Sequence, residues 1–149
     1  MEKLWTLQVS NTLNELKRVH GWLELIREHH VLAQETIFAI TLSLDELLTN
    51  TCSYGYDDTE THTIEVTLIA GADLVTVTLE DDARAFNPLE REAPDVSAAL
   101  DDRAIGGLGI HLVKSMMDSV RYERRGGQNF VTLEKRLQPS PNQTRDGGA

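Results

Sequence analysis

A continuous stretch from Gln34 to Tyr54 contains neither glycine nor proline, and it predicts one long helix. Its core-facing residues recur at the i, i+3, i+4, i+7 spacing of an amphipathic helix. They are Ile37, Ile40, Leu44, Leu47, Leu48 and Thr51. Gly55 follows directly, and we expect it to end the helix in a left-handed conformation. A helix of this length constrains the fold, because the rest of the chain must supply an apolar surface that covers its stripe.

The opposite face of this helix is unusual because most of its residues are small or uncharged. It comprises Ala39, Ser43, Glu46, Asn50 and Ser53 at helical spacing. Glu46 and Asn50 are one turn apart and can act on the same object. A glutamate can serve as a general base, and an asparagine oxygen suits Mg²⁺. A polar face with a chance Glu–Asn pair is the simpler explanation when the helix is considered alone.

The remaining periodicities predict strands and two further helices. Residues 3–9 favour a first strand, and residues 13–26 carry a helical apolar stripe. Alternating residues at 63–69 and 74–79 predict a hairpin, and residues 120–125 and 130–137 predict another around Gly126–Asn129. A further helix is expected to open at the glycine cluster 106–109. The order predicts an α+β fold, a two-layer sandwich with helices on one face of a mixed, mostly antiparallel sheet.

The chain is expected to form one domain over residues 1–137, with a flexible tail at 138–149. It has 149 residues, of which 40% are hydrophobic and 26% charged, as in ordinary globular proteins. Residues 84–105 carry prolines and many charges without periodicity. A loop of this length in a compact domain is usually functional. We therefore predict a lid over residues 84–105, with a short helix near residues 96–100.

Charge and targeting signals narrow the class of protein. The net charge of −10 argues against a nucleic-acid binder, which needs a basic surface. No apolar run is long enough to span a membrane, and the first residues lack a hydrophobic signal region. The single cysteine, Cys52, excludes an internal disulfide framework. Together these features predict a cytoplasmic protein.

Two later stretches carry further candidate binding residues that could act together with Glu46 and Asn50. Asp81 stands where the second predicted strand of the first hairpin becomes a loop, and its carboxylate can accept a hydrogen bond from an exocyclic amine such as N6 of adenine. Gly106-Gly107-Leu108-Gly109 opens a helix, where free N–H groups suit phosphates. Neither a Walker lysine motif nor a dinucleotide fingerprint is present, so the common phosphate-loop folds are not expected.

Glu46-x-x-x-Asn50, Asp81-x-Ala83 and Gly107-x-Gly109, in this order, resemble the asparagine box and the two glycine boxes of the GHKL ATPase superfamily. The sequence around Asp45–Asn50 and the run from Gly106 to Val113 resemble the anti-sigma factor serine kinase branch. The similarity extends over residues 3–137. It implies the ATP-binding sandwich of that superfamily and a role in transcription regulation.

The resemblance also implies a role for each matching position. Asn50 would bind Mg²⁺, and Glu46 would deprotonate a substrate serine. Asp81 and Ala83 would hold the adenine, and Gly107, Leu108 and Gly109 would wrap the triphosphate of ATP. The implied activity is that of a serine/threonine protein kinase that phosphorylates an anti-anti-sigma partner and sequesters a sigma factor. Members of this branch are commonly homodimers.

Ala83 departs from the family, which has glycine at this position. We expect its methyl group to crowd the base or to exclude a positive φ, at a cost of about 1–2 kcal/mol. This departure keeps open a second hypothesis, a non-catalytic module that binds nucleotide weakly and sequesters a partner. A third is a detached histidine-kinase catalytic domain, although no dimerising helical hairpin is evident and His20 is more simply a surface residue.

Overall fold

The computed structural model describes residues 2–30, 32–90 and 107–137 of the chain, and for Gly107 and Leu108 only the backbone. The strands are β1 (Lys3–Ser10), β2 (Thr63–Ala70), β3 (Leu74–Asp81), β4 (Ser119–Arg125) and β5 (Gln128–Arg136). The α-helices are α1 (Leu16–His29), α2 (Gln34–Tyr54) and α3 (Gly107–Met116), with short 3-10 turns at Leu13–Glu15 and Pro88–Glu90. The predicted lid beyond residue 90 and the predicted tail lie outside the described residues.

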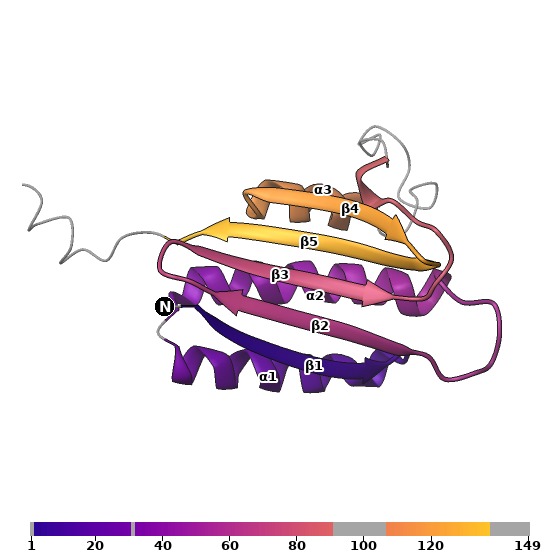
Figure 1. Cartoon of the computed structure of the whole chain (residues 1–149), viewed down its shortest axis with the longest axis horizontal. Helices are drawn as coiled ribbons and strands as arrows, with labels where there is room; N and C mark the ends of the chain where they lie inside the picture. The colour runs from indigo at the N-terminus through magenta and orange to yellow at the C-terminus, as the bar shows by residue number, and fades with distance from the viewer. Residues whose placement is uncertain (1, 31, 91–106, 138–149) are drawn as a thin grey trace, which may run out of the picture.

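The strands form one sheet in the order β1-β2-β3-β5-β4. All four pairings between the described strands are antiparallel, so the sheet lacks the parallel pair that a mixed sheet contains. The three α-helices of the described residues lie on the same face of this sheet (Figure 1). This arrangement confirms the predicted α+β sandwich with helices on one face.

Alternation along the strands decides which side chains face the helices. In β2 every second residue from Ile64 to Ala70 is buried, and the residues between them are partly exposed. In β3 the buried phase begins at Val75 and continues through Leu79 to Asp81. The core-facing side of β3 therefore ends in a carboxylate instead of an aliphatic group.

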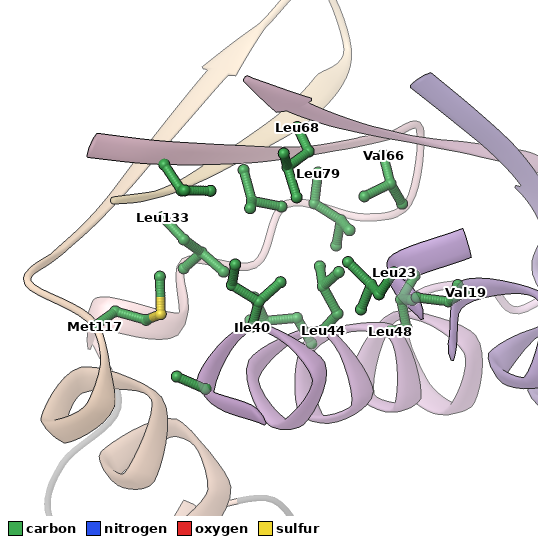
Figure 2. Packing of buried hydrophobic residues seen from close by; sticks show 14 of the residues in the cluster. Val19, Leu23, Ile40, Leu44, Leu48, Val66, Leu68, Leu79, Met117 and Leu133 are labelled. Carbon is green, nitrogen blue, oxygen red and sulfur yellow. The ribbon is translucent and has the colours of Figure 1, made fainter. Parts of the chain in front are cut away.

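The long helix α2 begins and ends where the sequence predicts and supplies the centre of the core. Ile40, Leu44 and Leu48 point toward the sheet, with Val19 and Leu23 of α1 beside them (Figure 2). The face with small residues is also covered, because Ala39 and Ser43 are buried and α3 packs against α2. The small residues of this face thus allow α3 to approach closely.

Two glycine predictions need revision. Gly55 has φ −80°, so α2 ends without the expected left-handed residue. The second hairpin turns at Gly126 and Gly127 alone, with φ of 54° and 77°, the positive values that a two-residue turn requires. Gln128 and Asn129 were expected in this turn, and they belong to β5 instead.

Candidate functional site

Asp81 is a buried acid at the end of β3, with 5% of its surface exposed. Its Oδ1 accepts hydrogen bonds from Asn129 Nδ2 at 2.9 Å and from the Ala83 N–H at 3.0 Å. Burial raises the pKa of the Asp81 carboxyl above its ordinary value, and the bonds from Asn129 and Ala83 oppose that rise in pKa. Its Oδ2 accepts no hydrogen bond from the described residues, so one oxygen of a desolvated acceptor remains available.

Asn129 fixes the orientation of this acid, and it lies outside the three motifs that the sequence predicts as the site. Its Oδ1 accepts from the Tyr122 hydroxyl and from Arg124 Nη1, which assigns its Nδ2 as the donor side. Nδ2 then donates to Asp81 Oδ1 and to the carbonyl oxygens of Ala83 and Arg84. This one amide therefore connects β4, β5 and the backbone after β3.

A signal for Asn129 exists in the alternation of β5. Asn129 is in phase with the buried Val131 and Leu133, as Asp81 is in phase with Leu79. The register of β3 and β5 places Asp81 directly opposite Asn129. A polar residue that continues a buried phase requires a buried partner, and here the two partners are a facing pair.

A cavity of about 280 Å³ opens beside Asp81. Leu47, Leu79 and Val131 supply apolar walls, while Asn50 and Asp81 supply polar groups. The remaining lining residues are Thr51, Tyr54, Gly55, Ala83, Arg84, Phe86, Pro88 and Asn129. Apolar walls with few fixed polar groups are typical of a small-molecule site, and Asp81 suits a ligand that carries an amine.

Ala83 is accommodated without the backbone strain that we expected. It is buried, and no residue other than glycine has a positive φ in the described part of the chain. A Cβ added at Gly55 would lie 2.8 Å from the Ala83 Cβ. The absence of a side chain at Gly55 therefore leaves room for the methyl group of Ala83, and the Arg84 N–H donates to the Gly55 carbonyl at 3.0 Å.

Glu46 and Asn50 are brought together on α2, as their spacing predicts. Asn50 Nδ2 donates to Glu46 Oε1 at 3.3 Å. Asn50 is 7% exposed, and its Oδ1 has no hydrogen-bond partner among the described residues. An amide oxygen held in this way fits Mg²⁺, which prefers oxygen ligands and keeps several waters.

A second cavity, of about 160 Å³, lies between α2 and α3. Glu46 and Gly109 both line it, whereas Asn50 and Asp81 line the first cavity. The hydrogen bond between Glu46 and Asn50 links the two cavities along α2. The predicted residues are thus divided between two cavities that α2 lines.

Gly107 is the first residue of α3, as the glycine cluster predicts. The first N–H groups of a helix have no partner within it and favour anions, so this end of α3 can receive phosphate oxygens. Gly106 and the side chain of Leu108 lie outside what the structure describes.

His20 is the residue that the histidine-kinase hypothesis considers. Its Nε2 lies 2.6 Å from Asp45 Oδ1, so the side chain pairs with an acid between α1 and α2. No helix in the described part of the chain combines the length and hydropathy that crossing a bilayer requires.

Comparison with known proteins gives concordant results. The profile of the histidine kinase-like ATPase domain matches residues 9–135. The chain is 30% identical over 134 residues to the serine/threonine-protein kinase BtrW of Bordetella bronchiseptica, which covers 90% of this chain and 94% of that protein.

A solved structure agrees with the fold. The crystal structure of the RsbU and RsbW domains of Rv1364c from Mycobacterium tuberculosis aligns with 92% of this chain, with a TM-score of 0.64 and 16% identity. The chain spans only 33% of that longer chain, and at this identity the likeness concerns the fold alone.

Proposed function

Because the chain belongs to the histidine kinase-like ATPase domain family, we propose that it is an Mg²⁺- and ATP-dependent serine/threonine protein kinase. In this proposal it phosphorylates an anti-anti-sigma protein and sequesters a sigma factor when that protein is unavailable. The observation that carries the proposal is the buried Asp81 at the end of β3, whose Oδ2 accepts no hydrogen bond from the described residues and which lines the same cavity as Asn50.

The adenine of ATP would occupy the cavity beside Asp81. Asp81 Oδ2 would accept a hydrogen bond from the N6 amine, while Asn129 holds Oδ1. Leu79 and Val131 would contact the apolar faces of the base. A buried acceptor of this kind discriminates sharply, because a base without the amine leaves it without a partner.

The phosphate end would lie toward α3. Asn50 Oδ1 would bind Mg²⁺, which neutralises charge on the phosphate oxygens when it is bound. The backbone N–H groups at Gly107, Leu108 and Gly109 would donate to the triphosphate. These contacts would position the reacting group, and phosphoryl transfer depends mostly on such positioning and charge neutralisation.

Glu46 would act as the general base. Its carboxylate would take the proton of the substrate serine hydroxyl while the serine oxygen bonds to the γ-phosphorus. The bond from that phosphorus to the bridging oxygen breaks at the same time, and ADP leaves. Glu46 lies beside Asn50, so the proposed base and the proposed metal ligand would act on the same reacting group.

The proposed base is tested by Glu46→Gln, which keeps the shape of the side chain and removes its basicity. With Mg²⁺, ATP and an anti-anti-sigma protein, wild type should label a serine, and the variant should be slower by about 10²–10⁴-fold. Glu35→Gln, which changes an acid in the first turn of the same helix, is the matched control and should label at the wild-type rate. Equal labelling by both variants would exclude Glu46 as the base.

The proposed adenine contact is tested by Asp81→Asn. Loss of a charged acceptor for the N6 amine should weaken ATP binding by about 1.5–3 kcal/mol in calorimetry. Purine riboside triphosphate lacks that amine, so it should bind wild type and variant more equally. A loss of the same size for both nucleotides would show that Asp81 does not bind the amine.

The alternative, a non-catalytic sequestering module, depended on steric interference by Ala83. Ala83 has no positive φ, so the backbone part of that hypothesis is wrong. Its methyl group lines the cavity beside Asp81, so crowding of the base is the part that binding measurements must test. Calorimetry distinguishes the two functions, since the alternative predicts tight partner binding with no heat from ATP and Mg²⁺.

A further inference from the structure

Gly109 is a glycine whose presence the backbone does not explain. It lies within α3, and the only glycines with positive φ in the described part of the chain are Gly126 and Gly127. Glycine in a helix is less favourable than alanine because its backbone loses more freedom on folding. A reason for glycine at this position must therefore come from its surroundings.

The carboxylate of Glu46 supplies that reason. A Cβ at position 109 would lie 1.9 Å from the Glu46 carboxyl carbon and 2.2 Å from each of its oxygens. The carboxylate thus occupies the space that any side chain at 109 would need. We propose that Gly109 is a positioning residue whose missing side chain sets the place of the Glu46 carboxylate, an inference that rests on the proposed role of Glu46 as base.

A side chain at position 109 would move Glu46 and not the helix. Ile110, Val113 and Met117 anchor α3 and its C-terminal end in the core, each with 5% or less of its surface exposed. Opposite α3, Ser43 is fully buried on α2, and its hydroxyl donates to the Ala39 carbonyl. Glu46 is only partly buried and has a flexible side chain, so its carboxylate is the group that gives way.

Gly109→Ala should therefore have different effects on folding and on phosphoryl transfer. Gly109→Ala should fold at least as well as wild type, because helix propensity improves and the conflict falls on a mobile side-chain end. The displaced Glu46 should lose its contact with Asn50, and phosphoryl transfer should fall by about 10²-fold, the lower range of a general-base effect. ATP affinity should stay within about two-fold of wild type, because alanine keeps the backbone N–H proposed to donate to the triphosphate and Glu46 is assigned to the transfer step rather than to ATP binding.

A double-mutant cycle tests this relation without depending on activity. Wild type, Gly109→Ala, Glu46→Ala and the double variant are compared in urea unfolding. Gly109→Ala should raise the urea midpoint of unfolding more in the Glu46→Ala background than in the wild-type background. Gly21→Ala in α1 is the matched control, because nothing lies within 4 Å of a Cβ there, and it should raise the midpoint equally in both backgrounds.

Two further measurements address the site. Glu46→Asp shortens the acid, which leaves space for a methyl group at position 109. Gly109→Ala should therefore reduce the rate of phosphoryl transfer less in the Glu46→Asp background than in wild type. Calorimetry with ATP and Mg²⁺ asks whether Gly109 instead serves close approach of the phosphates. In that case Gly109→Ala would weaken ATP binding even in the Glu46→Ala background, and this result would overturn the inference.

The remaining outcomes are also decisive. Equal midpoint shifts in the presence and absence of Glu46, or full transfer by Gly109→Ala, would overturn the positioning role. Coupling in the unfolding cycle together with no transfer by wild type would refute the kinase proposal while confirming the steric relation between the two residues.

Discussion

At the scale of single residues, one methyl group decides the contact between the end of α2 and the loop after β3. Ala83 carries that methyl and Gly55 has none, and a Cβ at Gly55 would lie 2.6 Å from the Thr51 carbonyl oxygen. Gly55 is therefore needed for close approach, whereas its φ of −80° is open to any residue. The position tolerates no side chain although its backbone conformation is ordinary.

We predict that Gly55→Ala destabilises the protein by about 1–3 kcal/mol, the usual effect of overpacking. Urea unfolding measures the free-energy change, and Gly21→Ala is again the control because its Cβ meets open space. Gly55→Ala should also weaken ATP binding, since Gly55 lines the cavity beside Asp81. Unchanged stability would mean that the two segments separate easily.

At the scale of elements, side chains tie the loop between α2 and β2 to the end of β3. The rings of Tyr56 and His62 stack with centroids 4.1 Å apart. The Tyr56 hydroxyl donates to Asp82 Oδ1 at 2.9 Å, and His62 Nδ1 lies 3.2 Å from Asp82 Oδ2. Asp82 is exposed, yet it connects the α2–β2 loop to the end of β3.

The contacts of His62 with Asp58 and Asp82 make the stability of the fold depend on pH. The hydrogen bond with Asp58 raises the pKa of His62 above its ordinary 6.5, and the bond with Asp82 raises it further. The charged imidazole thus favours the folded state. Its contribution is fully present below pH 6.5 and is lost as the pH rises through the higher folded-state pKa of His62.

We predict that the difference in unfolding free energy between wild type and His62→Gln shrinks as the pH rises above 6.5. Urea unfolding at a series of pH values measures it. Asp58→Asn removes the largest cause of the pKa shift and should narrow the pH range over which stability changes. A difference in unfolding free energy that stays constant with pH would show that protonation of His62 does not stabilise the folded state.

At the scale of the whole molecule, one core joins the helical layer to the sheet. Leu44 is fully buried at its centre, where α2 faces the strands (Figure 2). Leu4 belongs to β1 but is 62% exposed. The same chemical change at these two positions therefore separates core packing from surface effects.

Leu44→Ala should destabilise the protein by about 2–5 kcal/mol, through lost burial and the cavity left behind. Leu4→Ala should change stability by about 0.5 kcal/mol or less. Urea unfolding of the two variants compares them directly. Similar losses at both positions would mean that Leu4 is covered in solution.

Much of the fold could be predicted because periodicity is a local property. The bounds of α2 follow from the stripe between Gln34 and Tyr54, and the first hairpin follows from alternation on either side of Gly71. The spacing of Glu46 and Asn50 on one helix likewise predicts their contact. None of these inferences requires knowledge of which distant segments meet.

Tertiary structure alone decided what lies opposite each of these residues. The pairing of β3 with β5 places Asn129 against Asp81, and no short-range pattern specifies that pairing. The packing of α3 on α2 places Gly109 against Glu46, and the end of α2 places Gly55 against Ala83. Sequence periodicity determines which face of an element is buried, but long-range packing selects the neighbour, because that choice depends on the shapes of all layers together.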